Sequence, residues 1–154
     1  MDRIWKSNMN PGLKKRFFVA TVESILIYGC ESWAMTGAME KSLNGTYTCT
    51  LHKIQNVHWS SHTTNEVAIA DKIAAKRLQL AGHCHRHPEL STQKVLLWEP
   101  KHGQRGKGRP WTSYVDTLKN DTGAKSTSEL ASLMEDRDVW RSHVHAHWVA
   151  SSLK

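Results

Sequence analysis

The first third of the chain alternates apolar and polar residues at helical spacing. Asn10 followed by Pro11 favours a helix start, because Asn10 can accept from free N–H groups and proline has no N–H to leave unpaired. A helical period then continues to about residue 33, and its members on successive turns are Leu13, Phe17, Ala20, Ser24 and Ile27. The second half of this run is nearly all apolar. The sequence therefore predicts a buried helix that Gly37 terminates.

A second helix is predicted over about residues 39–55, where one stripe contains Leu43, Tyr47, Leu51 and Ile54. A third is predicted over about residues 65–85, with Pro88 as the stop signal. At 100° per residue its polar stripe contains Lys72, Lys76, Gln79, His83, Arg86 and His87, and the opposite side contains Ile73, Ala74, Leu78, Leu80, Ala81 and Cys84. Arg77 and His85 fall on the apolar side, so the pattern is imperfect.

The remaining third also has a mainly helical pattern. The run "KVLLW" fits a strand or a short buried helix equally well, and residues 99–110 form a basic loop rich in glycine and proline. A helix with Trp111, Tyr114, Val115 and Leu118 should stop at Gly123, and Ser126 with Glu129 resembles a capping box. A last helix, from about Glu135, has its apolar positions at Val139, Trp140, Val144 and Trp148. We expect an all-α or nearly all-α protein, a small helical bundle in two lobes joined by the basic loop.

Charge and cysteine content narrow the function classes. The 154 residues have a formal net charge of +7 and an isoelectric point near 9.5, which favours a polyanionic partner. Three cysteines without a repeating spacing are not a disulfide framework, so we expect a reducing intracellular compartment, nuclear or cytoplasmic. The longest apolar stretch is too short to span a bilayer, and no membrane partner is expected.

Three metal or catalytic sites are conceivable, and the spacing disfavours each of them. A zinc site could combine Cys49 and His52 with the dense segment "AGHCHRHPE" (residues 81–89), but on a helix Cys84 points away from His83 and His87. His143 and His147 lack the glutamate of a zinc peptidase motif, which predicts a solvated histidine face. Glu89, Glu99 and Lys101 superficially match a nuclease pattern, but Pro100 would interrupt the strand that such a site needs. We therefore expect no catalytic residue, no bound metal and no cofactor.

The basic residues suit contact with nucleic-acid phosphate. The helix with the polar stripe is followed by a loop whose cations are separated by glycines, as in a flexible arm that can lie along a phosphate backbone. The segment "AGHCHRHPE" is then the end of an amphipathic helix, with Ala81 and Cys84 inward. The predicted nucleic-acid-binding residues are Lys72, Lys76, His83, Arg86, His87, Lys101, Arg105, Lys107 and Arg109.

Several segments in order resemble the carboxyl-terminal part of non-LTR (LINE-like) retrotransposon reverse transcriptases. They are "LKKRFFVATVESILIYGCESW", "TNE", "KRLQLAGHCHRHPE", "VLLWEPKHGQRGKGRPWTSYVDTLKNDTG" and "LMEDRDVWR". The matching positions are Tyr28, Gly29, Cys30, Glu31 and Trp33, then Gly82, His83 and Arg86, then Arg105, Gly108, Arg109 and Pro110. The resemblance covers about residues 11–141.

The resemblance implies that residues 1–60 are a thumb-like helical segment. Residues 61–98 would hold the basic amphipathic helix and a short apolar segment, residues 99–110 the basic loop, and residues 111–154 a helical tail. The paired palm aspartates of that family's RNA-directed DNA polymerase are missing, so we expect a non-catalytic fragment that binds RNA or DNA, with the polymerase palm as another possible partner. The alternative is an orphaned helical fragment that binds proteins through apolar surface around Phe17, Ile25 and Ile27, or has no function.

Overall fold

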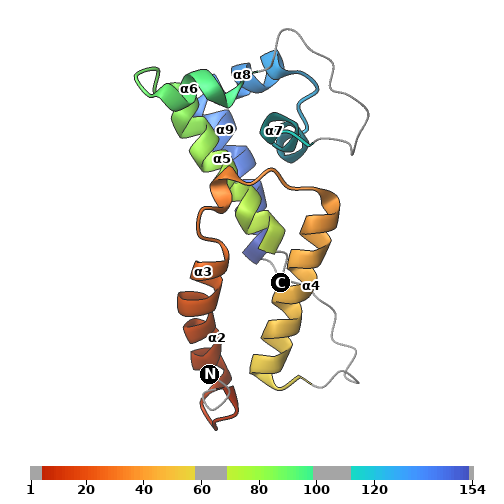
Figure 1. Ribbon diagram of the computed structural model, residues 1–154. Coiled ribbons are helices and arrows are strands. Elements are labelled where there is room, and N and C mark those ends of the chain that lie inside the picture. Colours follow the sequence, from red (N-terminus) through yellow and green to blue (C-terminus); the bar gives the residue numbers. More distant parts are fainter. Residues whose placement is uncertain (1–4, 58–68, 99–111, 153–154) are drawn as a thin grey trace.

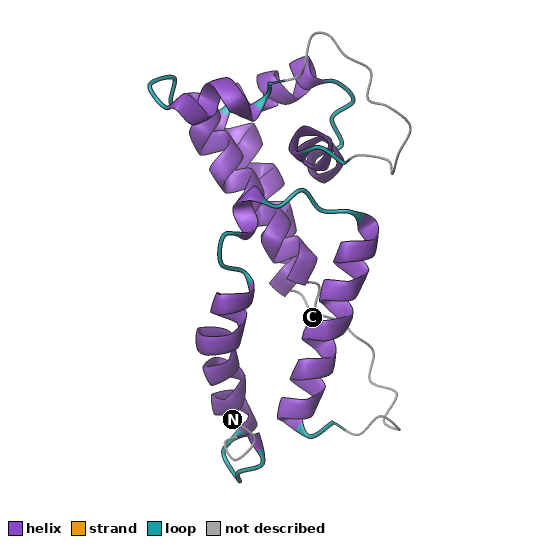
Figure 2. Cartoon of the chain, viewed as in Figure 1, coloured by secondary structure: helices purple, strands orange, loops and turns teal. Residues whose placement is uncertain are grey.

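The computed structural model describes residues 5–57, 69–98 and 112–152, and within these ranges the regular structure is helical throughout (Figure 2). The all-α prediction is confirmed. The elements are α2 (Pro11–Phe18), the π-helical η1 (Val19–Glu23), α3 (Ser24–Leu26), the 3-10 turn η2 (Cys30–Ser32), α4 (Gly37–Gln55), α5 (Ile69–Arg86), α6 (Ser91–Leu96), α7 (Tyr114–Thr122), α8 (Thr127–Glu135) and α9 (Arg137–Ser152). The run "KVLLW" is therefore mainly helical, in α6.

Two groups of buried side chains form the core, and α5 contributes to both. The first group comprises Phe18, Ile27, Cys30, Met35, Tyr47, Leu51, Ile54, Ile69 and Ile73, and the second comprises Ala75, Leu78, Ala81, Val115, Leu118, Ala124, Leu130, Met134, Trp140 and Val144. Helices α5 and α9 lie side by side, while α2 and α4 extend away from them (Figure 1). A single helix thus connects the two halves of the core. The basic loop that we expected to join two lobes lies outside the described residues.

The first helical segment buries a face that agrees with the predicted stripe only at Ile27. Its buried side chains are Lys14, Phe18, Glu23 and Ile27, whereas Leu13 is largely exposed. The step from Phe18 to Glu23 spans five residues, one more than an α-helical turn, and coincides with η1. A π-helical turn adds one residue and rotates everything after it. The predicted stripe was right at Ile27 and wrong at its four earlier positions, because it assumed an uninterrupted 3.6-residue period.

This helix also ends earlier than predicted and is not buried along its second half. Helix α3 stops at Leu26, and Gly29 adopts a left-handed conformation with φ of 68° before the η2 turn. Ile25 is 78% exposed and Tyr28 86% exposed. Gly37, predicted to break a helix, instead begins α4, with the hydroxyl of Thr36 as its cap.

Local capping explains where several helices begin and end. Asn10 Oδ1 accepts from the Gly12 amide at 2.8 Å, as the Asn-Pro start predicted. Gly123 ends α7 with φ of 75°, also as predicted. Ser126 accepts from the Glu129 amide, but the Glu129 carboxylate accepts from Lys125 rather than from Ser126. The reciprocal capping box belongs to another helix, α7.

The predicted faces of the later helices agree better with the structure. On the apolar side of α5, Leu80 is the exception, since it is 39% exposed, while the other five predicted positions are buried. On α4, Tyr47, Leu51 and Ile54 are buried. No helix among the described residues combines the length and apolar character that crossing a membrane requires.

Candidate nucleic-acid interface

The first two lysines of the α5 polar stripe are paired with carboxylates from the segment before α4, one in η1 and one in η2. Lys72 Nζ lies 2.8 Å from Oε1 of Glu23, and Lys76 Nζ lies 3.7 Å from Oε1 of Glu31. Glu23 is buried and also accepts a hydrogen bond from the hydroxyl of Tyr47. Burial, and then the bond to Glu23, raises the pKa of Tyr47 well above its ordinary value of 10, so this group remains a hydrogen-bond donor. These two lysines therefore have structural partners within the chain.

The far end of the stripe, in "AGHCHRHPE", has a different environment. Ala81 and Cys84 are buried and His83 is exposed, as predicted, and α5 ends at Arg86. The rings of His83 and His87 are 4.4 Å apart, and His87 Nδ1 lies 2.7 Å from Oε1 of Glu89. The segment is confirmed as the end of an amphipathic helix.

A small groove between α5 and α9 gathers three arginines. It has a volume of about 180 Å³ and is lined by Gln79, Arg86, Arg137, Trp140, Arg141 and Val144. Arg86 donates from Nη1 to the backbone oxygen of Met134 at 3.0 Å, which holds its guanidinium in place. Arg141 Nη1 lies 3.8 Å from Oδ1 of Asp138 in an exposed contact, and Arg137 has no hydrogen-bond or ion-pair partner among the described residues. Arg137 and Arg141 are exposed, and Arg86 is half-buried.

Gly82 allows α5 and α9 to approach closely at this groove. A Cβ at Gly82 would lie 2.3 Å from Nε1 of Trp140, which is too close for any side chain, and 3.1 Å from Nη1 of Arg86. The buried Trp140 indole instead donates to the backbone oxygen of Leu78 at 2.8 Å. The missing side chain at Gly82 therefore admits the indole that forms the floor of the groove.

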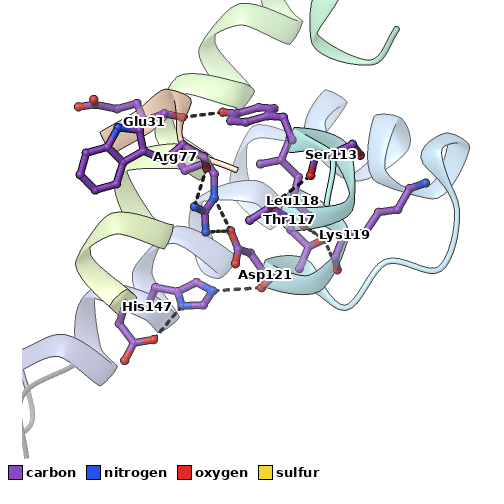
Figure 3. Close-up of polar contacts among 12 residues, drawn as sticks. Glu31, Arg77, Ser113, Thr117, Leu118, Lys119, Asp121 and His147 are labelled. Atoms are coloured by element: carbon purple, nitrogen blue, oxygen red, sulfur yellow. Dashed lines mark hydrogen bonds and ion pairs between the residues drawn. The ribbon is translucent and has the colours of Figure 1, made fainter. Parts of the chain in front are cut away.

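Arg77, the residue that disturbed the predicted apolar side of α5, forms a buried ion pair (Figure 3). Its side chain is 1% exposed, and its Nη2 and Nε lie 2.6 and 2.8 Å from Oδ2 of Asp121 on α7. Nη1 donates to the backbone oxygen of Trp33, and the Tyr114 hydroxyl donates to the backbone oxygen of Glu31. Burial raises the pKa of Asp121, and Arg77 opposes that rise. This network connects α5 and α7 to η2 and the residues after it.

His147 belongs to the same network rather than to a solvated histidine face, so the prediction was wrong for this residue. Its Nε2 lies 3.0 Å from the backbone oxygen of Asp121, and its Nδ1 lies 3.3 Å from Oδ1 of Asp71 (Figure 3). Both ring nitrogens thus face acceptors on other helices. The histidine connects α9 to α5 and α7.

The described residues offer little to the metal-site alternatives. No group of three or more histidine, cysteine, aspartate or glutamate side chains in the described ranges could hold a metal ion. The nuclease pattern needs a strand after Glu89, whereas residues Ser91–Leu96 form α6. Glu99 and Lys101 lie outside the described residues.

The structure thus divides the predicted binding residues. Lys72 and Lys76 pair with acids, while His83, Arg86 and His87 lie near the end of α5, and Arg86 lines the groove. The four predicted loop residues, Lys101, Arg105, Lys107 and Arg109, lie outside the described residues. The sequence pattern had pointed to no role for Arg137 and Arg141. Their i,i+4 spacing in "RDVWR" was the available signal, since it places both on one helix face.

Comparisons with known proteins gave no match, whether the chain was tested against protein-family models, curated proteins or solved structures.

Proposed function

We propose that this protein is a non-catalytic piece of a non-LTR retrotransposon reverse transcriptase that contacts the phosphate backbone of RNA or DNA. Among the described residues, the contact surface is the C-terminal end of α5 together with the first turns of α9. The predicted binding residues of the basic loop, 99–110, remain part of the proposal from the sequence alone. The proposal assigns no polymerase activity to this chain.

One observation carries the binding proposal: Arg86, Arg137 and Arg141 line a single groove, and among the described residues only Asp138 approaches them as an ion-pair partner. Guanidinium groups bind phosphate oxygens through paired N–H donors, and neutralising phosphates releases counterions. The paired lysines Lys72 and Lys76 are assigned a smaller part.

A binding titration over a salt series tests the proposal. Labelled RNA and DNA oligonucleotides, single-stranded and duplex, are titrated with protein at about 50 to 200 mM salt. Affinity should fall steeply with salt and depend little on sequence. The variant R137Q/R141Q should bind more weakly, and its salt slope should be smaller by about one for each phosphate that the protein no longer neutralises.

The matched control is K15Q/R16Q, which removes two exposed cations from α2, at the opposite end of the molecule from α6 and α8 (Figure 1). It changes the net charge by the same amount. Equal loss of affinity in both variants would mean that binding follows net charge alone, and affinity indifferent to salt would reject nucleic-acid binding.

The exposed apolar side chains of the first segment favour a second candidate, protein interaction. Of the three residues predicted for this alternative, Ile25 is strongly exposed, Phe17 is 38% exposed and Ile27 is buried. Leu13 and Tyr28 are also strongly exposed. Exposed apolar surface favours association with another protein. Light scattering at increasing protein concentration distinguishes the candidates, since a monomer throughout would count against this one, and I25S/Y28S should abolish any association.

A further inference from the structure

The positive charge of Arg86, Arg137 and Arg141 is gathered in the groove between α5 and α9. Three guanidiniums line it, but three exposed acids are close by in the sequence, with Glu135 at the end of α8, Asp136 just before α9 and Asp138 in the first turn of α9. Asp136 Oδ1 already accepts from the amides of Asp138 and Val139, at 2.9 and 3.2 Å, so the first amides of α9 are occupied. The anion-binding capacity here therefore comes from the arginine side chains.

These carboxylates limit how a nucleic acid can lie at the groove. A run of consecutive phosphates crossing the start of α9 would bring some of them near Glu135, Asp136 and Asp138, where like charges repel. A strand that ends in the groove presents its terminal phosphate to the arginines, and no further phosphates continue past the groove toward the carboxylates. The charge pattern therefore favours an end of a strand over its middle.

Size and charge point to the same ligand. The groove, at about 180 Å³, is smaller than the roughly 300–1,000 Å³ of pockets that enclose whole small molecules, so it suits one phosphate group rather than a nucleotide. An internal phosphodiester has one negative charge, but a phosphomonoester has about −1.5 to −2 at pH 7 and three terminal oxygens. The more highly charged group better matches three guanidiniums, whose one ion pair among the described residues is the exposed contact of Arg141 with Asp138.

We infer that the groove formed by Arg86, Arg137 and Arg141 binds the terminal phosphomonoester of a nucleic-acid strand. Gln79, also in the lining, supplies an amide donor, and Arg86 is positioned in advance by its bond to Met134. The inference rests on the proposed nucleic-acid binding and narrows it, since ends bearing phosphate bind more tightly than ends bearing hydroxyl.

The test uses one single-stranded oligonucleotide sequence in three forms, with a 5′-phosphate, with a 3′-phosphate, and with hydroxyl at both ends. A hydroxyl-ended oligonucleotide two nucleotides longer, which has two more negative charges, controls for the charge that the terminal phosphate adds. Fluorescence anisotropy with the full chain should show at least about threefold tighter binding of one or both phosphate-ended forms than of this control. R137Q/R141Q should remove the difference, and K15Q/R16Q should keep it.

The outcomes separate the two proposals. Equal, salt-dependent binding of all forms would overturn the terminal-phosphate inference and leave the proposed function standing. Failure of every oligonucleotide to bind would overturn both. A preference for the phosphate-ended forms that survives in R137Q/R141Q would also overturn the inference, because the preference would then come from another site. Preference for the 5′ or the 3′ form identifies which end the groove accepts.

Discussion

The two ends of the α5 polar stripe look alike in sequence and differ in the fold. At the N-terminal end, Lys72 and Lys76 lie against Glu23 and Glu31, whereas at the C-terminal end Arg86 lies in a groove with two further arginines. The acids at the first end come from residues about 45–50 positions earlier in the chain. A basic stripe therefore shows where cations can gather, but their availability to a ligand depends on which other segment packs beside them.

The largest expected effect on stability concerns α5, the helix that contributes to both groups of core side chains. Replacing the buried Arg77 by Met leaves the Asp121 carboxylate buried without its ion-pair partner, and should lower the free energy of unfolding by about 3–5 kcal/mol. Chemical denaturation measures this. The double variant R77M/D121L should recover much of the loss, and a double variant as unstable as the single one would contradict the ion-pair explanation.

A second, smaller effect is expected at the contact between α5 and α9. Gly82→Ala places a Cβ against Trp140 and should cost about 1–3 kcal/mol, as overpacked cores do. The control is Gly45→Ala on α4, where a Cβ meets nothing within 4 Å. That change should instead stabilise by up to about 1 kcal/mol, because alanine favours the helix. Thermal unfolding of both variants gives the comparison, and equal destabilisation would contradict it.

The contrast between the two ends of the stripe can be tested directly with one variant at each. Lys72→Gln removes the partner of buried Glu23 and should cost about 1–2 kcal/mol of stability, with little change in oligonucleotide affinity. Arg141→Gln should do the reverse, since its contact to Asp138 is exposed and worth at most about 0.5 kcal/mol. Chemical denaturation measures the stability of both variants, and fluorescence anisotropy measures their affinity for oligonucleotides. If both variants lost the same oligonucleotide affinity, the two ends of the stripe would not differ in their availability to a ligand.

The smallest effect is a pH dependence at the start of α7. The hydroxyl and amide of Ser113 donate to Asp116, which lowers the pKa of that carboxyl from its ordinary value of 3.8. A carboxyl with a lowered pKa in the folded state stabilises the fold above its unfolded pKa, and this contribution disappears as pH falls through the folded value. Asp116→Asn should cost about 0.3–1 kcal/mol at pH 7. The difference from the unsubstituted protein should shrink as pH falls below the ordinary carboxyl pKa of 3.8 and through the lowered folded value, and a constant difference across pH would contradict it.

The errors of the sequence prediction are instructive because each has an identifiable cause. The faces of α4 and α5 were predicted well, since both helices keep a regular period and bury branched or aromatic side chains. The buried face of the first helix was shifted by the π-helical turn at Val19–Glu23. No residue in this stretch is one whose type would predict such a turn. The histidine face of α9 was misjudged because the acceptors for His147 come from α5 and α7.

Among the described residues, several positions on which the predicted resemblance rests lie at contacts between helices. Cys30 is buried, Glu31 pairs with Lys76, and the backbone oxygen of Trp33 accepts from Arg77. Gly82 admits Trp140. These residues thus have structural roles in addition to any contact with a ligand.

The sequence by itself determined the all-α class, the caps at Asn10 and Gly123, the apolar stripe of α4 and the inward positions at the end of α5, because these depend on backbone geometry and on spacing within one element. Only the tertiary structure decided which cations are neutralised and which converge. Ion pairs such as Lys72 with Glu23, and clusters such as Arg86 with Arg137 and Arg141, join residues about 50 positions apart, and their energy depends on distances that only packing fixes.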